Sequence, residues 1–198
     1  MPVVVNPLLA TFITGGLFIT VLGRPIAGLM TALTDWLNSM GGGSAFDLGG
    51  PVNKVAYGFG AAGLATAGTA TDSMALRIMA AVMAAGMVAP LAMALATTIR
   101  PKLFTEPERE IGKAAWLLGA SFISEGAIPF AATDPARVIA SSVVGSALTG
   151  GLIMAFGSTL MAPHGGLWVL PLIGGALWFV LALLAGVVVM AAIVVALK

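Results

Sequence analysis

The sequence predicts an all-α integral membrane protein with about five transmembrane helices plus re-entrant hairpin segments. Of its 198 residues, 59% are hydrophobic and only 9% are charged, and the mean hydropathy is +1.06. Soluble domains average about 25% charged residues, so a water-soluble fold would lack polar surface here. Residues 138–197 include no Asp, Glu, Lys or Arg, whereas one bilayer-spanning helix needs roughly 20 apolar residues. That stretch alone has room for two passes.

The composition also excludes several functional classes. The net charge of +1 provides no basic field of the kind that nucleic acid requires, so no nucleic-acid partner is expected. The chain has no cysteine, which excludes disulfides, thiolate metal sites and a cysteine nucleophile. We expect neither a metal nor a cofactor.

The N-terminal part predicts one span and one helix at the membrane surface. Residues 2–23 are uncharged and lack the basic start and cleavage site of a signal peptide, so we expect a first membrane helix. Residues 27–40 place leucines at helical spacing with Asp35 on another face, which is typical of an amphipathic interfacial helix.

Segment 45–71 predicts a re-entrant or broken element. It is rich in glycine and places Asp47, Asn53 and Lys54 close together. Irregular backbone at membrane depth is tolerated only where protein buries it or where it lines a wet cavity. Asn53 and Lys54 would therefore either position this loop or contact a substrate.

A second span is predicted over residues 74–99. Ser73 is one of three consecutive candidate N-caps, and Arg77, near the start, can extend to the membrane surface. Pro90 predicts a kink.

The stretch "RPKLFTEPEREIGK", residues 100–113, is the most hydrophilic loop and holds four of the nine basic residues. The positive-inside rule therefore places it in the cytoplasm. Thr105 and Glu108 have the spacing of a capping box, so we expect a helix to begin there and to enter the membrane near Lys113.

A break is predicted inside the next membrane segment, 114–136, which we expect to be re-entrant. Gly126 and Pro129 should stop the incoming helix. Asp134 followed by proline should begin a new helix, with about eight non-helical residues between the two. Beyond it we expect a span over 136–161.

The final segment, 167–197, allows two interpretations. It forms either one long tilted helix or a short piece followed by a span, divided near Pro171 or at Gly174 and Gly175. His164, in "APHGG", is the only histidine and would either cap a turn or contact a ligand.

Glu125 is the main candidate for function. A carboxylate at the bilayer centre costs about 2.5–3.5 kcal/mol, and a water-filled, ligand-binding cavity would offset this. The helix that begins at Pro135 would direct its free N–H groups into the same cavity. A carboxylate that accepts two hydroxyls suits a sugar, but it also suits a proton or a metal cation. The structural alternative is an ion pair with Lys54 or Arg137.

Three segments resemble a known family: "FDLGGPVNKVAYGFG", "FISEGAIPFAATDPARVI" and "APHGGLWV". They are similar to the membrane-embedded IIC component of the bacterial phosphoenolpyruvate-dependent sugar phosphotransferase system, fructose branch. The resemblance implies a multi-pass subunit of the bacterial cytoplasmic (inner) membrane that binds and translocates a sugar. The expected sugar is fructose. A phosphorylated IIB partner, supplied through IIA, would then phosphorylate the sugar.

The resemblance also implies roles for individual residues. Glu125 would bind sugar, and a part in deprotonating the attacking hydroxyl is a further hypothesis. No residue of this chain is expected to be phosphorylated, and a homodimer is expected. The remaining implied residues are Asp47, Asn53, Lys54 and His164 for substrate binding, with Gly126, Pro129, Asp134 and Arg137 in support.

The resemblance implies that residues 1–198 form a partial IIC transport domain, its C-terminal half. It also implies an internal deletion between "NSMGGGS" and "AFDLGG". Two other functional hypotheses stay open at this point. One is an ion- or proton-coupled carrier that uses Glu125 and Asp134, and the other is a fragment that functions only beside a missing N-terminal half.

Overall fold

A computed structural model describes residues 57, 58, 60–62 and 73–198, all of which belong to one compact unit, Met40–Lys198. The predicted span over 2–23 and the predicted interfacial helix over 27–40 lie outside the described residues, as does most of segment 45–71.

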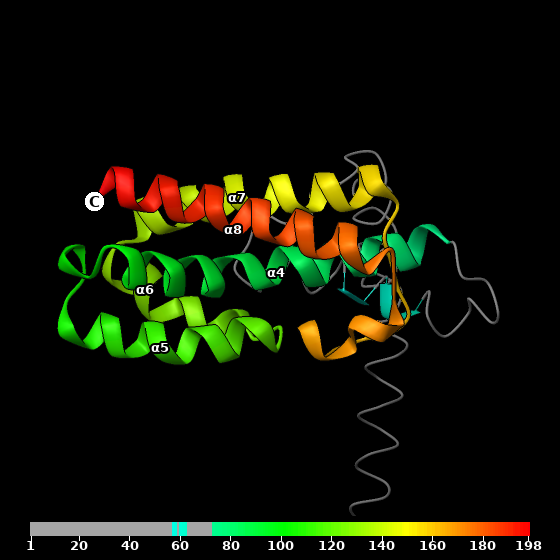
Figure 1. The fold of residues 1–198 in the computed structure, drawn as a ribbon, viewed down its shortest axis with the longest axis horizontal. Helices are drawn as coiled ribbons and strands as arrows, with labels where there is room; N and C mark the ends of the chain where they lie inside the picture. Colours follow the sequence, from blue (N-terminus) through cyan, green and yellow to red (C-terminus); the bar gives the residue numbers. More distant parts are fainter. Residues whose placement is uncertain (1–56, 59, 63–72) are drawn as a thin grey trace, which may run out of the picture. The chain divides into compact units, whose positions relative to one another are not determined.

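Three long helices form the core of this unit: α4 (Met74–Ile99), α7 (Pro135–Phe156) and α8 (Ala176–Leu197) (Figure 1). Each is long and apolar enough to cross a membrane. Of the most apolar part of α4, 94% is buried, against 44% for α7 and 39% for α8, so α4 is the central helix. The all-α membrane fold is confirmed, with three candidate spans among the described residues.

The predicted second span is confirmed with its bounds. Ser73 is the N-cap of α4, and its hydroxyl accepts a hydrogen bond from the Leu76 N–H at 3.3 Å. Pro90 lies inside the helix, where it is buried.

Small residues allow α7 and α8 to pack closely, as is common between membrane helices. A Cβ atom at Gly145 would lie 2.7 Å from the Cβ of Met190, and one at Gly186 would overlap the hydroxyl of Thr149. That hydroxyl donates to the Ala182 carbonyl across the interface at 3.2 Å. Side-chain hydroxyls thus replace bulky apolar contacts between the two helices.

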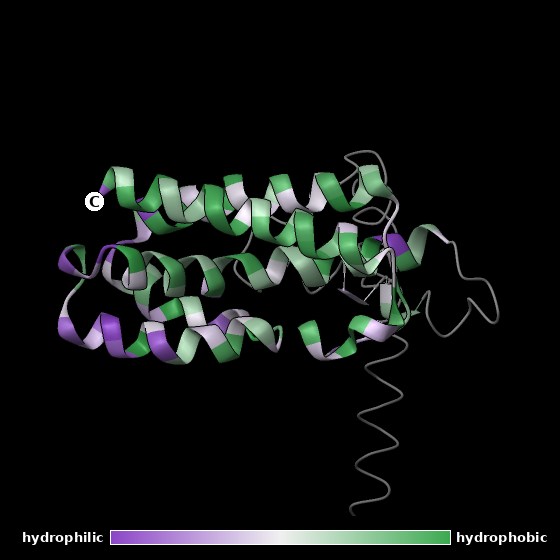
Figure 2. Cartoon of the chain, viewed as in Figure 1, coloured by the Kyte–Doolittle hydropathy of each residue, from purple (hydrophilic) through white to green (hydrophobic). Residues whose placement is uncertain are grey.

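A helical hairpin runs beside the three spans. The turn η3 (Pro101–Leu103) leads into α5 (Glu106–Ala120), which is followed by η4 (Ser124–Ala127) and α6 (Ile128–Thr133). Thr133, at the end of α6, donates to Glu108 in the first turn of α5 at 3.2 Å, so the hairpin leaves and returns to the same end of the bundle. Figure 2 shows hydrophilic residues gathered at that end, where α5 begins.

The break in this hairpin differs from the prediction. α5 ends at Ala120, ahead of Gly126, and Gly126 itself lies in η4. Pro129 does not stop a helix but occupies the first turn of α6, where a missing N–H has no consequence. The predicted non-helical stretch is therefore mostly made of short helical turns.

A loop at the opposite end joins α7 to α8. Strand β1 (Thr159–Leu160) pairs antiparallel with β2 (Ile173–Gly174), and η5 (Gly166–Leu172) lies between them. α7 ends at Phe156, earlier than predicted, because Gly157 takes up a left-handed conformation with φ 67°. Segment 167–197 is divided just before α8, at Gly174 and Gly175, which confirms the second of its two interpretations.

Candidate functional site

The end of α5 is built on a residue in a rare conformation. Phe122 has a φ of 62° and is the single described non-glycine residue with a positive φ. The Ile123 N–H donates to the Leu118 carbonyl at 2.8 Å, and the Phe122 N–H donates to Gly119 at 3.1 Å. This is the Schellman pattern that ends many helices, but its left-handed position usually holds glycine. The hairpin tip, which we define as residues 121–127, begins with this turn.

Glu125 lies in the hairpin tip and is exposed, whereas Ser124 and Gly126 on either side of it are buried. Among the interactions of the described residues, its carboxylate has neither a hydrogen bond nor an ion pair. The predicted alternative of an ion pair with Arg137 is wrong, because Arg137 pairs with Asp134 at 3.1 Å. Lys54, the other proposed partner, lies outside the described residues.

Gly126 fixes the hairpin tip against the central helix. A Cβ atom on Gly126 would lie 3.1 Å from the Leu118 side chain and 3.3 Å from the Cβ of Pro90 in α4. These distances are tighter than ordinary van der Waals contact, so a larger residue would push the tip away from α4.

Aromatic rings from three parts of the chain meet beside the hairpin tip. The ring of Phe122 lies 5.4 Å from the ring of His164 and 6.4 Å from the ring of Tyr57. Trp168 donates its indole N–H to the Ser121 hydroxyl at 3.0 Å. We call Tyr57, Phe122, His164 and Trp168 the aromatic cluster.

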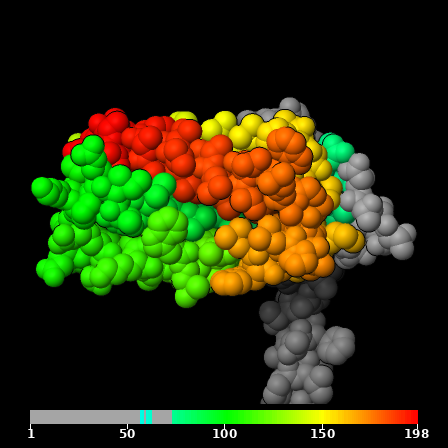
Figure 3. Space-filling model, in the orientation of Figure 1, coloured from blue at the N-terminus to red at the C-terminus, as the bar shows by residue number. Residues whose placement is uncertain are grey.

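The loop that follows α7 contacts the hairpin through its backbone. Gly166 has a φ of 60°, and a Cβ there would overlap the carbonyl oxygen of Ala120 and lie 2.8 Å from the Phe122 nitrogen. Only glycine allows this approach. Figure 3 shows the residues around η5 lying against the end of α5 on the visible face.

A cluster of polar side chains lies at the base of the hairpin. The predicted capping box is confirmed: the Thr105 N–H donates to Glu108 Oε2 at 2.8 Å, and the Glu108 N–H donates to the Thr105 hydroxyl at 3.4 Å. Lys198 donates to Glu108 Oε1 at 3.3 Å and lies 4.4 Å from the centre of the Phe104 ring. Burial by itself would raise the pKa of Glu108, but the Thr105 hydrogen bonds and the Lys198 charge outweigh it, so the pKa is lowered.

Asp134 and the start of α7 lie at this base and not at the hairpin tip. Thr133, next to Asp134, bonds to Glu108, and residues 109–120 of α5 separate that level from the tip. At 1.5 Å per residue this is about 18 Å. The expectation that the helix beginning at Pro135 directs its N–H groups towards Glu125 is therefore wrong. Asp134 is the N-cap residue of α7, but its side chain makes no capping hydrogen bond.

No group of three His, Cys, Asp or Glu side chains in the described part of the chain could hold a metal ion.

Comparison with known proteins gives clear relatives. The "PTS system fructose-specific EIIB'BC component" of Escherichia coli is 47% identical over 204 residues, which cover 95% of this chain and 35% of that protein. The "Fructose permease IIC component" of Bacillus amyloliquefaciens is 43% identical, over 97% of this chain and 64% of that protein. The chain is homologous to these fructose-specific phosphotransferase components.

The match between this IIC homologue and its relatives is partial in length. The chain spans about a third of the first curated relatives it matches. The alignment with the Rhodobacter capsulatus "PTS system fructose-specific EIIB'BC component", 47% identical, runs over 212 residues and covers 100% of this chain and 36% of that protein. The chain has 198 residues, so that relative has residues inside the matched region without a counterpart here. No family model and no solved structure matches the chain.

In this IIC homologue, the three segments with the family resemblance meet at one place. Tyr57 belongs to the first segment, Phe122 to the second and His164 to the third, and the ring of Phe122 lies against both of the others. Of the other predicted site residues, Asp47, Asn53 and Lys54 lie outside the described residues.

Sequence reasoning missed part of this arrangement. Tyr57, the only tyrosine in the chain, and Trp168 were not predicted as site residues, and neither was Phe122. Tyr57 and Trp168 lie inside the recognised segments, and aromatic residues with a polar tip are common where a pocket is partly wet. Their place in these segments and their polar tips were the only indications that Tyr57 and Trp168 belong to the candidate site. Nothing in the sequence indicated a left-handed phenylalanine.

Proposed function

We propose that this chain is the C-terminal half of a IIC transport domain that binds fructose and carries it across the bacterial inner membrane for phosphorylation by a phosphorylated IIB partner. Relatives named as fructose-specific components at 43–50% identity support this. The observation that carries the proposal is the hairpin tip. It holds an exposed, unpaired Glu125, and three residues earlier in the sequence it holds Phe122, whose ring lies against residues of the two other recognised segments.

The depth of the hairpin supports a site inside the membrane. α5 begins close to the end where α4 terminates, and its part beyond Lys113, residues 114–120, reaches about 10 Å into a hydrocarbon layer of about 30 Å. The tip therefore lies within the bilayer when α4 spans it, as a re-entrant segment does. In such a place a carboxylate needs a wet cavity, which a transport site provides.

The residues of the site would divide the work of sugar recognition. Glu125 accepts hydrogen bonds from two sugar hydroxyls, and His164 adds one further polar contact. The rings of Tyr57 and Trp168 supply apolar faces. Asp47, Asn53 and Lys54 would approach the same sugar from segment 45–71.

Orientation and partners follow from the basic loop. The end of α4, the turn η3 and the first part of α5 hold four basic residues, Arg100, Lys102, Arg109 and Lys113. The positive-inside rule places that end of the bundle in the cytoplasm. IIB would dock there, with IIA as its phosphate source. The relative "PTS system fructose-specific EIIABC component" of Bacillus subtilis joins these parts in its name. A homodimer is part of the same proposal.

The test compares two glutamates of one hairpin. Glu125→Gln keeps the shape but removes the charge, and we expect phosphoenolpyruvate-dependent fructose phosphorylation by membranes with purified phospho-IIB to fall at least 100-fold. Glu110→Gln is the matched control, because Glu110 is exposed and pairs only with Lys113 among the described contacts. It should stay within about twofold of the parent chain.

Fructose binding and phosphorylation are measured on the same membranes. If Glu125 also assists removal of the hydroxyl proton, phosphorylation should fall more than binding, whereas equal losses indicate recognition alone. Retained phosphorylation in Glu125→Gln would contradict the assignment of the site. Each assay is run with and without a co-expressed N-terminal half from a relative. If the parent chain neither binds nor phosphorylates fructose under either condition, the proposed function is contradicted.

A further inference from the structure

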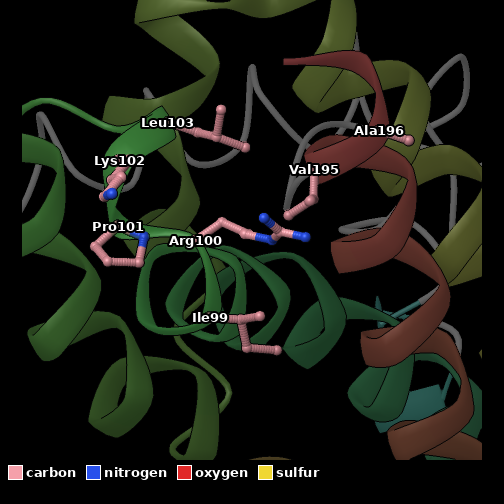
Figure 4. Close-up of a pocket in the computed structure, with 7 residues that line it drawn as sticks. All are labelled: Ile99, Arg100, Pro101, Lys102, Leu103, Val195 and Ala196. Carbon is pink, nitrogen blue, oxygen red and sulfur yellow. The ribbon is translucent and has the colours of Figure 1, made fainter.

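A shallow pocket lies at the base of the bundle, away from the hairpin tip. It has a volume of about 650 Å³ and lies between the end of α4 with η3 on one side and the end of α8 on the other (Figure 4). The lining residues are Ile99, Arg100, Pro101, Lys102, Leu103, Val195 and Ala196.

The pocket is cationic and its cations are not paired. Arg100 and Lys102 are both exposed, and the described residues that line the pocket include no carboxylate. The described ion pairs involve other residues, and neither Arg100 nor Lys102 takes part in one. Figure 4 shows the Arg100 side chain extended towards Val195, with Lys102 farther from α8. An anion entering the pocket would thus find two free positive groups.

The remaining walls of the pocket are apolar. Five of the seven lining residues are apolar, and Ile99 and Leu103 are 60% and 38% exposed. The pocket lies where the two apolar spans α4 and α8 end. When α4 and α8 span a bilayer, their ends lie at the level of the lipid headgroups, with acyl chains below.

We propose that this pocket binds the headgroup of an anionic phospholipid, with Arg100 and Lys102 contacting the phosphate and the apolar wall contacting the glycerol and upper acyl chains. Basic pockets between membrane helices on the cytoplasmic side commonly hold such lipids. The inference does not depend on the sugar site, because none of its residues belongs to the hairpin tip or the aromatic cluster.

Two other anions are less well matched to the pocket. A free phosphate needs a closed set of donors, whereas this pocket is open and mostly apolar. An acidic protein surface would leave the apolar wall, at headgroup level, without a matching contact. A lipid alone satisfies the charge and the apolar wall together.

The test measures lipid binding to the purified full chain in zwitterionic nanodiscs by native mass spectrometry. Phosphatidylglycerol is added, with phosphatidylcholine and inorganic phosphate as separate arms. A basic side chain that contacts an anionic headgroup is worth roughly fivefold in affinity. Because Arg100 and Lys102 would both contact the phosphate, Arg100→Gln with Lys102→Gln should weaken phosphatidylglycerol binding about 30-fold. Ala196→Trp, which fills the pocket without changing charge, should also weaken it.

The control removes two charges at the same end of the bundle but outside the pocket. Arg109→Gln with Lys113→Gln lowers the net charge equally, and neither residue lines the pocket. This variant should keep phosphatidylglycerol binding within about threefold. Equal loss in both double variants would overturn the proposal in favour of general surface charge. Competition by inorganic phosphate at equal strength would overturn it in favour of a free-anion site.

Discussion

Phe122 shows what a single residue determines in this fold. Its positive φ disfavours any side chain with a Cβ, by about 1–2 kcal/mol, yet it turns the ring towards His164 and Tyr57. A glycine at this position would end α5 equally well but would remove the centre of the aromatic cluster. Strained residues of this kind concentrate at functional sites, which agrees with the role proposed for Glu125, three residues after Phe122 in the sequence.

Glu108 gives a pH prediction at the same scale. Its pKa is lowered below the usual 4.5, so its contribution to stability is complete above pH 4.5 and is lost as the pH falls through the lowered value. Glu108→Gln should therefore lower the unfolding midpoint at pH 7, with a loss of about 1–3 kcal/mol because Lys198 stays behind without its partner. Thermal unfolding in detergent from pH 3 to 7 measures this.

The acid side of that curve provides the control. As the pH falls through the lowered pKa of Glu108, the parent chain and Glu108→Gln should approach each other in stability, since the parent carboxylate becomes protonated. Glu110→Gln, whose partner Lys113 is exposed, should change the midpoint little at any pH. A difference between parent and Glu108→Gln that stays constant over the whole acid range in which both chains remain folded would contradict the role assigned to the charge.

At the scale of elements, the α7–α8 contact predicts opposite effects for one substitution. Gly186→Ala places a Cβ against the Thr149 hydroxyl and the Gly145 carbonyl, and overpacking of this kind costs about 1–3 kcal/mol. Gly151→Ala meets nothing within 4 Å and gains helix propensity, which is worth up to about 1 kcal/mol. Unfolding midpoints of the two variants should shift in opposite directions. Equal shifts would show that the α7–α8 interface is looser than described.

The elements themselves were largely predictable from the sequence. The bounds of α4, the capping box of α5 and the start of α7 at Pro135 depend on local rules, namely apolar length, cap residues and proline at the first turn. The end of α5 was not predictable, because Ser121 and Phe122 include none of the residues that usually end helices. Gly126, six residues after the actual end of α5 at Ala120, was the stronger indication, and it was misleading.

The site was partly predictable for a related reason. Glu125 and His164 are conspicuous because charge and histidine are rare in this chain. The contact of Tyr57 with Phe122, and of Trp168 with Ser121, joins residues far apart in sequence, and no local pattern encodes such contacts. The direction of the Pro135 helix was mistaken because sequence spacing alone does not say that α6 returns to the base of the hairpin.

For the whole molecule, the hairpin predicts a labelling pattern. The chain has no cysteine, so single cysteines can be introduced without removing others. Lys102→Cys and Ala136→Cys, on exposed residues at the base, should react with a membrane-impermeant maleimide only from the cytoplasmic side. Met161→Cys, an exposed residue in the loop between α7 and α8, should react only from the opposite side.

The pair at the base distinguishes a hairpin from a full crossing. Were α5 and α6 to traverse the bilayer completely, Ala136→Cys would react from the side opposite to Lys102→Cys, and the re-entrant proposal would be abandoned. Labelling after solubilisation in detergent confirms that each cysteine is chemically accessible.

The contact of Gly126 with Pro90 joins the hairpin tip to the place where the central helix α4 bends most easily. Proline has no N–H, so the carbonyl of Gly86 in the turn before it lacks its usual helical partner, and α4 pivots more easily there than elsewhere. Gly126 packs against Pro90 and follows Glu125 directly in the chain. A bend of α4 at Pro90 would therefore move the Glu125 carboxylate.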